Sequence, residues 1–464
     1  MYSVILILSL VPFGFGEYDL TILHTNDVHD RMEQLDSGGG SCSVEEAENG
    51  ECYGGFARLS TMVKHIRKYN GKDIRKDSGN VLFLDAGDQF QGTNWFVHYK
   101  GAATSYFMNK IGYDVQALGN HEFDLGPSGL APFLKDVDFP VISCNIDASK
   151  EPVIDGLFNK SVILTVGGER IGVVGYTYSR TDDISATGQA IFNDEIESLQ
   201  AEIDVLLSQG INKIIALGHS GIMKDLDIAA KVKGVDIVVG GHSNTFLYTG
   251  TPPDTAGHEV LHGEYPKVIT PDHDPYGTVL VVTAYTFAKY LGRLDVTFDN
   301  DGRVTQWAGN PILLNSDVEE DPNVLVEINQ WSEVLANLSS VKLGVTHVYL
   351  DGKTNSCRLH ECNMGNMITD AYIWEQVTFP DDIRWSDVNI AIHNSGNIRA
   401  SIQPGNLDTS VVSEYIERFS PIYAGVERRI TFITDGNGSA TVSMKQKDMF
   451  IYLILTSLIF TFVS

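Results

Sequence analysis

The chain has 464 residues, 43% of them hydrophobic, which is enough to bury a large core and to form two domains. Its formal net charge is −27 at pH 7, so its surface repels phosphate backbones, and this argues against nucleic-acid binding. An anionic small substrate would therefore need local positive charge, supplied by bound metals or by individual arginines.

Residues 1–16 have the pattern of a secretory signal peptide. The run VILILSL at 4–10 is its apolar region, and glycines at 14 and 16 supply small residues for cleavage, although no Lys or Arg precedes the apolar run. A buried first strand is the alternative interpretation.

Between residues 17 and 314, short Val/Ile/Leu runs alternate with helical patterns at 56–69, 102–111 and 194–207. This alternation predicts an α/β domain in which helices cover the sheets. Five of the apolar runs end in loops that carry Asp, His or Asn. The runs and their loop residues are 20–23 with Asp27 and His29, 81–84 with Asp85 and Asp88, 115–118 with Asn120 and His121, 213–216 with His219, and 235–239 with His242.

This combination of carboxylate, imidazole and amide groups suits divalent metals of intermediate softness, such as zinc or manganese. Three histidines and two aspartates exceed the needs of one ion, so we infer two metals with Asp88 as the bridging carboxylate. Asp85 is the alternative ligand, but it lies closer to its strand, which favours a structural role. Two metals roughly 3.5–4 Å apart can hold a hydroxide and stabilise both oxygens of an in-line displacement. Phosphate monoesters, which hydrolyse very slowly unaided, need such help. His121 is then the candidate for stabilising the phosphoryl or leaving-group oxygen, and Asp124 can accept its other N–H.

The five cysteines fit an oxidising compartment. Cys42 and Cys52 enclose a Gly/Ser/Glu-rich loop, and Cys357 and Cys362 bracket Arg-Leu-His-Glu, so each pair is a candidate local disulfide. We expect Cys144 to be a buried free thiol. A zinc–thiolate site is the alternative, but no CxxC pair supports it.

Beyond residue 314 the chain becomes acidic, and apolar spacing over 323–338 predicts a helix with Pro322 in its first turn. We interpret 315–340 as a linker helix; the alternative is the last helix of the first domain. Residues 341–434 are then a smaller second unit. In residues 435–464, small residues, a polar spacer and a short apolar tail follow one another, as in a GPI-attachment signal with Asn437 as the attachment site. The tail has about 15 residues, fewer than the roughly 20 that span a bilayer as a helix. The alternatives are a short membrane helix and a frayed apolar terminus.

Two further positions, Asn159 and Asn337, begin Asn-X-Ser sequences and are candidate glycosylation sites. They fit the secretory interpretation of the N-terminus.

The loop motifs resemble those of the calcineurin-like metallophosphoesterases. The longer sequences around them resemble the 5′-nucleotidase family within that group. These sequences are LHTNDVH at 23–29, ALGNHEFD at 117–124 and GGHSNTFLYTG at 240–250. The resemblance extends over residues 18–399. It implies a four-layer sandwich of two β-sheets flanked by helices, followed by a linker helix and an α/β C-terminal domain. It also implies a di-zinc centre that converts extracellular AMP to adenosine at the cell surface. The metal ligands that it implies are Asp27, His29, Asp88, Asn120, His219 and His242.

The same resemblance implies catalysis by His121 and Asp124. The substrate contacts that it implies are Asn244, the phosphate-binding Arg358 and Arg399, and the nucleoside contact Asn394. The family's Pro-Phe-Gly and Phe-Leu-Ala-Asn-Gly-Gly-Asp-Gly-Phe motifs, whose phenylalanines sandwich the purine, are missing from this sequence. We therefore expect a truncated second domain, an intact metal site, little or no AMP turnover, and no family homodimer. The alternatives are an apyrase that cleaves ADP or ATP, and a non-catalytic surface binding protein that retains the metal site.

Overall fold

The computed structural model describes residues 17–69, 79–255, 259–338, 342–352, 354–357, 360–378, 405–408, 431–433 and 439–441. The predicted signal peptide and the predicted site residues Arg358, Asn394, Arg399 and Asn437 lie outside these residues. The chain divides into two compact units between residues 421 and 422. Within the described residues, no helix is both long enough and apolar enough to cross a bilayer.

The first sheet has seven strands in the order β14-β13-β1-β2-β3-β4, with β15 paired to β13. Its central strands β1 to β4 run parallel, and β13 is antiparallel to β1. The bounds are Tyr18–Thr25 (β1), Val81–Asp85 (β2), Val115–Ala117 (β3), Val141–Ile142 (β4), Tyr290–Phe298 (β13), Val304–Gly309 (β14) and Ile312–Leu313 (β15). In the register of β1 and β2, Thr25 lies opposite Asp85, so the loops that follow these strands start at the same level.

The second sheet has six strands in the order β11-β12-β10-β9-β7-β6, with β7, β9, β10 and β12 parallel. The bounds are Ser161–Val166 (β6), Glu169–Thr177 (β7), Ile214–His219 (β9), Ile237–Val239 (β10), Lys267–Ile269 (β11) and Val279–Val282 (β12). A separate short pair joins β5 (Ile146–Asp147) and β8 (Ile191–Phe192).

The helices of this region are α1 (Val44–Asn49), α2 (Phe56–Tyr69), α3 (Asn94–Tyr99), α4 (Gly101–Ile111), α5 (Gly126–Asp136), α6 (Glu195–Ser208), α7 (Ile222–Lys231) and α8 (Pro322–Leu338), with 3-10 turns η1 (His121–Phe123) and η2 (Thr181–Asp183). The predicted helices at 56–69, 102–111, 194–207 and 323–338 are all present, and their ends differ from the prediction by at most one residue.

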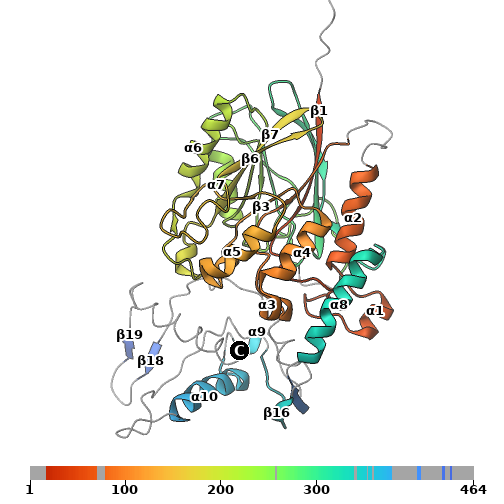
Figure 1. Cartoon of the computed structure of the whole chain (residues 1–464), viewed down its shortest axis with the longest axis vertical. Helices are drawn as coiled ribbons and strands as arrows, with labels where there is room; N and C mark the ends of the chain where they lie inside the picture. Colours follow the sequence, from red (N-terminus) through yellow and green to blue (C-terminus); the bar gives the residue numbers. More distant parts are fainter. Residues whose placement is uncertain are drawn as a thin grey trace, which may run out of the picture. The chain divides into compact units, whose positions relative to one another are not determined.

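Three apolar clusters arrange these elements in four layers. Because side chains alternate across a strand, Ile22 and Leu84 point to the second sheet and meet residues such as Leu217 between the sheets. Leu23 faces the other way, onto the cluster that contains the apolar faces of α2, α4 and α5. The second sheet packs its outer face against α6 and α7, and Figure 1 shows these helices on the opposite side of the sheets from α2 and α4. The predicted four-layer sandwich is thus confirmed.

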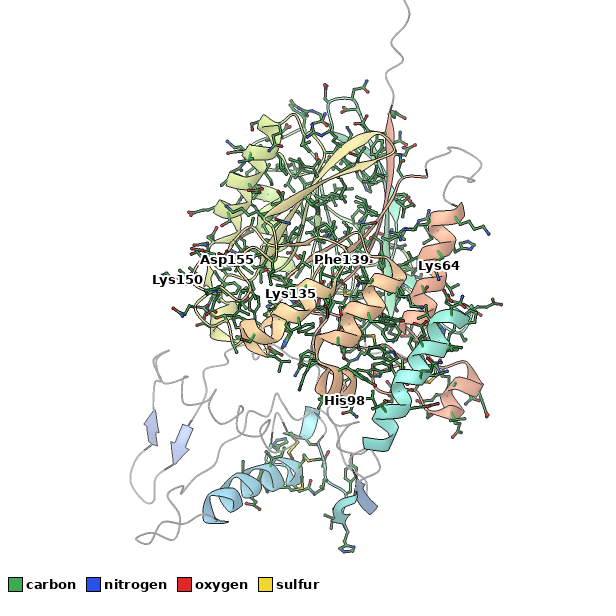
Figure 2. All side chains as sticks on the ribbon, in the orientation of Figure 1. Lys64, His98, Lys135, Phe139, Lys150 and Asp155 are labelled. Carbon is green, nitrogen blue, oxygen red and sulfur yellow. A yellow bond between two sulfur atoms is a disulfide. The ribbon has the colours of Figure 1, made fainter. Side chains whose placement is uncertain are left out.

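Charged side chains lie on the surface of this layered domain, and apolar side chains lie between the layers. Lys64, Lys135, Lys150 and Asp155 are exposed, whereas Phe139 is buried under the first sheet's helices (Figure 2).

Helix α8 buries Val324, Ile328 and Leu335 in the first apolar cluster, and its Trp331 packs against aromatic residues of α3 and α4. The Trp331 ring lies 4.8 Å from Tyr99, 5.2 Å from Tyr106 and 5.7 Å from Phe107, measured between ring centroids. On the same helix, the Glu327 carboxylate accepts from the Tyr106 hydroxyl at 2.6 Å and pairs with Lys110 at 2.7 Å. The predicted domain boundaries after residues 314, 340 and 434 stay predictions.

The described C-terminal elements are β16 (Lys342–Thr346), α9 (Thr354–Cys357), α10 (Asn363–Thr378), β17 (Gly405–Asp408), β18 (Thr431–Ile433) and β19 (Ser439–Thr441). β16 pairs with β17, and β18 pairs with β19, both antiparallel.

Both predicted disulfides are present, Cys42–Cys52 and Cys357–Cys362. Cys144 is a buried free thiol, as predicted.

Candidate metal centre

The loops after β1, β2 and β10 and the last residue of β9 bring five predicted metal ligands together at one edge of the two sheets. Because parallel strands end at the same edge of a sheet, their loops can share one site. Two groups form there, Asp27 with His29 and Asp88, and Asp88 with His219 and His242. Within each group the potential ligand atoms lie within 4.8 Å of one another, and all five residues are buried. Asp88 belongs to both groups, which is the arrangement predicted for a bridging carboxylate.

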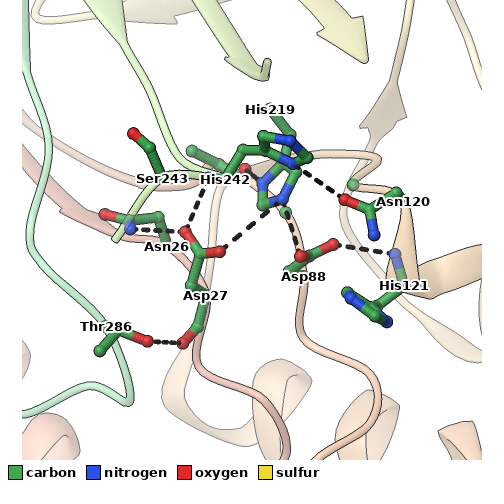
Figure 3. Close-up of polar contacts among 12 residues, drawn as sticks. Asn26, Asp27, Asp88, Asn120, His121, His219, His242, Ser243 and Thr286 are labelled. Carbon is green, nitrogen blue, oxygen red and sulfur yellow. Dashed lines mark hydrogen bonds and ion pairs between the residues drawn. The ribbon is translucent and has the colours of Figure 1, made fainter. Parts of the chain in front are cut away.

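The sixth predicted ligand, Asn120, follows β3 and faces the second group. Its Oδ1 lies 3.0 Å from Nδ1 of His242. Figure 3 marks this contact with a dashed line. An amide oxygen and an imidazole nitrogen at this separation can both contact one ion.

Backbone carbonyls orient two of the histidine rings. Nδ1 of His219 lies 2.7 Å from the Ala86 carbonyl, and Nδ1 of His29 lies 3.1 Å from the Phe90 carbonyl. A carbonyl can only accept, so each Nδ1 carries a hydrogen, and in His29 this leaves Nε2 to present a lone pair. Nε2 of His219 lies 2.8 Å from Oδ2 of Asp88, which is an acceptor, so without an ion this nitrogen also carries a proton. A cation would replace that proton and be held through Nε2.

Unpartnered buried atoms test whether the residues fit a cation. Oδ2 of Asp27 accepts from the Asn26 amide at 2.8 Å and from the His242 backbone N–H at 2.9 Å. Oδ1 of Asp27 and Nε2 of His29 are buried, 3.8 Å apart, and have no hydrogen-bond partner among the described residues. Leaving such atoms unpaired costs free energy. A divalent cation would satisfy both, so the residues fit one.

The backbone at these ligands is strained. Asp27, His29, Asp88 and His242 have φ values of 50°, 52°, 58° and 78°, in the left-handed region that residues other than glycine rarely adopt. Strain of this kind persists where the surrounding structure enforces it, and it clusters at functional sites.

Burial and neighbouring charges shift the protonation of the cluster in opposite directions. Burial raises the pKa of Asp27 to about 7 and lowers the pKa of His29 to about 3. Burial alone would raise the pKa of Asp88, but His219 and His121 hold it far below its usual range. Against the effect of burial, the carboxylates of Asp88 and Asp27 raise the pKa of His219 to about 10. Asp88 is therefore anionic, as a bridging ligand must be.

The predicted catalytic pair lies beside the metal ligands but outside both groups. Nδ1 of His121 lies 2.6 Å from the Asp124 carboxylate, and the His121 backbone N–H donates to Oδ1 of Asp88 at 2.9 Å. Burial by itself lowers the pKa of His121, but Asp124 and Asp88 raise it to about 9. The ring is therefore protonated near neutral pH and can donate a hydrogen bond or a proton.

The predicted substrate contact Asn244 lies two residues after His242 and is half-buried. Its φ is 49°, and its Oδ1 is a buried atom without a hydrogen-bond partner among the described residues. The candidate glycosylation residue Asn159 is exposed, and Asn337 lies in α8. The roles predicted for these residues remain proposals.

Asp85, the alternative ligand, accepts hydrogen bonds from Thr25 Oγ1 at 2.7 Å and from the Gln89 amide at 2.6 Å. It belongs to neither ligand group in the described part of the chain. This agrees with the structural role that its position next to β2 predicted.

Sequence reasoning missed three residues that support Asp27. The Asn26 side chain holds its carboxylate, and Thr286 Oγ1 and the Phe287 N–H both donate to its carbonyl at 2.8 Å. Asn26 is a polar residue inside the motif at 23–29 and could have been singled out. Thr286 is 259 residues from Asp27, and no local pattern points to it.

Comparison with known proteins assigns the family. The calcineurin-like phosphoesterase model matches residues 20–246, and the model of the 5′-nucleotidase C-terminal domain matches residues 342–423. A snake venom 5′-nucleotidase of Naja atra is 50% identical over 392 residues, which are 83% of this chain and 70% of the venom protein. The chain belongs to the 5′-nucleotidase family.

Other members of the 5′-nucleotidase family agree. The 5′-nucleotidase of Bos taurus is 51% identical over 84% of this chain, and that of Homo sapiens is 50% identical over 85%. This chain spans 66% of the length of each of these two relatives. Among solved structures, a 5′-nucleotidase precursor from Thermus thermophilus aligns with a TM-score of 0.72 and 37% identity. That alignment covers 86% of this chain and 74% of the Thermus chain. Proteins of the metallophosphoesterase family use a dinuclear metal site, and the two ligand groups described above are its candidate here.

Proposed function

We propose that this chain is a metal-dependent phosphomonoesterase that acts on nucleoside 5′-monophosphates, with AMP converted to adenosine and phosphate. The observation that carries this proposal is the pair of buried ligand groups that share Asp88. The names of the similar proteins, which are 5′-nucleotidases, support the substrate class. Zn²⁺ is the proposed metal because histidine and carboxylate ligands suit it.

The proposed site residues divide into metal ligands and residues that act on the substrate. Two bound cations would stabilise the attacking and leaving oxygens of an in-line displacement. The proposed metal ligands are Asp27, His29, Asp88, Asn120, His219 and His242. Asp124 accepts one proton of the His121 imidazolium at Nδ1, so the second N–H of the ring, at Nε2, can donate to the phosphoryl or leaving-group oxygen. Asn244 is proposed to contact the substrate.

The second domain is proposed to supply Arg358 and Arg399 for the phosphate and Asn394 for the nucleoside. Because the purine-sandwiching motifs are missing, binding energy that orients the phosphate is lost, which lowers kcat as well as affinity. The loss of one aromatic stacking pair, worth roughly 0.5–1.5 kcal/mol, corresponds to about two- to tenfold weaker binding. We therefore propose that AMP turnover is impaired. The family dimerises through its second domain, so the truncation of that domain also disfavours the homodimer.

The location proposed is the outer face of the plasma membrane, with a GPI anchor at Asn437. The two disulfides support passage through an oxidising compartment. Release of the protein from cells by a phosphatidylinositol-specific phospholipase C would test the anchor. The released amount should fall when Asn437, Gly438 and Ser439 are all replaced by bulky residues, and equal release would contradict the proposal.

Activity is tested by phosphate release from AMP, ADP, ATP and an aryl phosphate, with the full chain loaded with Zn²⁺ or Mn²⁺. We expect hydrolysis of the aryl phosphate, slower hydrolysis of AMP than in full-length relatives, and no activity in Asp88→Asn. A preference for ATP or ADP would indicate an apyrase. Two bound ions without hydrolysis of any substrate would overturn the proposal and favour a binding protein.

A further inference from the structure

The Glu122 side chain joins the loop after β2 to the loop after β3. Its carboxylate is fully buried, at 0% exposure, and accepts four backbone N–H bonds. Oε2 accepts from Gly119 at 2.6 Å and from Asp88 at 3.0 Å, and Oε1 accepts from Gln89 at 2.7 Å and from Phe90 at 3.2 Å. Three of these donors belong to the Asp88 loop and one to the loop that carries Asn120.

The two loops that this carboxylate joins are closely packed against each other. A Cβ on Gly119 would lie 2.2 Å from Oδ1 of Asp88, which leaves no room for a side chain or a water there. The neighbouring His121 N–H already donates to that oxygen. Without Glu122, several buried N–H groups would have no acceptor, and such groups are rare in folded proteins.

The contacts of Glu122 separate it from the residues that act on substrate. Both of its oxygens face backbone N–H groups, and it belongs to neither metal-ligand group among the described residues. The side chain next to it in sequence, His121, faces Asp124 instead. Glu122 is therefore placed to act through other residues.

We propose that Glu122 is a positioning residue that fixes Asp88 relative to Asn120 and His121. Because both ligand groups share Asp88, a shift of the Asp88 loop moves one ligand of each group. Loss of the Glu122 carboxylate should therefore weaken both metal positions together, not one of them. This inference rests on the metal centre proposed above.

Glu122→Gln tests the proposal, because it preserves size while replacing one acceptor oxygen by an NH₂ group that faces two N–H donors. We expect the affinity of the full chain for Zn²⁺ to fall about 10- to 100-fold at both positions, as is typical when a residue behind metal ligands is changed. Chelator competition and metal analysis measure this without any activity assay. A lower melting temperature with unchanged affinity at both positions would show a merely structural role and overturn the proposal.

Glu195→Gln is the matched control. Glu195 is also fully buried, accepts the Ser179 N–H at 2.9 Å and pairs with Lys224 at 3.2 Å. The substitution Glu195→Gln should lower the melting temperature of the metal-free chain and leave its Zn²⁺ affinity unchanged. An equal loss of affinity in Glu195→Gln would show that buried glutamates act on the centre through stability alone, and this would also overturn the proposal.

Glu122→Asp keeps the test decisive if Glu122→Gln fails to fold. Glu122→Asp retains the negative charge, but its side chain is one methylene shorter, so the carboxylate cannot reach both loops. We expect Zn²⁺ to bind at least about tenfold more weakly at both positions. Unchanged affinity would contradict the inference. The unaltered chain separates the two proposals. If it binds no Zn²⁺, the proposed function fails. If it binds two ions and Glu122→Gln and Glu122→Asp match it, only the inference on Glu122 fails.

Discussion

The carboxylate of Asp124 accepts a hydrogen bond of 2.6 Å from Nδ1 of His121. Since a carboxylate only accepts, this contact fixes both the tautomer and the orientation of the ring. Asp124→Asn removes the charge and can present an NH₂ group to Nδ1 instead. We expect kcat on an aryl phosphate to fall by about 10- to 100-fold, with the metal content unchanged, as measured by steady-state kinetics and metal analysis.

Ser185→Ala is the control for this pair, because Ser185 Oγ contacts the other Asp124 oxygen at 3.4 Å and does not contact His121. We expect kcat to change by less than about threefold, since this long contact is worth little. If Asp124→Asn behaved like Ser185→Ala, the pair would have no catalytic role.

Asp85, the last residue of β2, and Asp88, in the loop that follows, should respond differently to the same substitution. Asp88 belongs to both ligand groups, so Asp88→Asn should abolish the binding of both ions. Asp85 bonds to Thr25 and Gln89 and belongs to neither group of the described residues, so Asp85→Asn should retain both. Metal stoichiometry after dialysis measures the difference. Retention of two ions by Asp88→Asn would disprove the bridging role.

Trp331 should hold helix α8 on the first domain. Trp331→Ala removes ring contacts with Tyr99, Tyr106 and Phe107. Because the side chain is half-buried, we expect a loss of about 2 kcal/mol, below the range for fully buried aromatic residues. Urea unfolding measures it. Val326→Ala on the same helix, at a site 54% exposed, should change stability by less than about 0.5 kcal/mol, and equal effects would contradict the packing role.

Asp225 should make stability depend on pH. It is buried on α7, accepts from the Tyr176 hydroxyl at 2.7 Å, and burial raises its pKa from 3.8 to about 8. Between these values the folded chain keeps a proton that the unfolded chain releases. Its contribution to stability is therefore complete below about pH 4 and is lost as the pH rises to about 8, by at most about 1.4 kcal/mol per unit.

Asp225→Asn keeps an acceptor for Tyr176 and cannot ionise, so this part of the pH dependence should disappear. Urea unfolding at several pH values from about 5 to about 8 compares the two proteins. Parallel curves for the two proteins would show that Asp225 does not carry the proton.

The sequence predicted the parts of the site that depend on local pattern. Apolar runs followed by Asp, His or Asn located the ligands because strand ends and metal-binding side chains are both visible in a few neighbouring residues. The left-handed backbone at Asp27 and His29 could not be predicted, because neither residue favours that conformation by itself. The carbonyl of Ala86 that sets the His219 tautomer could not be found either, since it comes from a loop 133 residues away.

The hydrogen bond from His219 to Ala86 crosses from the second sheet to the first, as does the bond of 2.7 Å from Thr177 Oγ1 to the Leu118 carbonyl. These contacts between the two sheets can form only after both sheets have been synthesised. The ribosome completes β1, β2 and β3 well before it makes His219 and His242, so four of the six proposed metal ligands are made before the other two. A divalent ion that binds only the finished arrangement would stabilise the chain at the last stage of maturation, and ion uptake would report that the two sheets have docked.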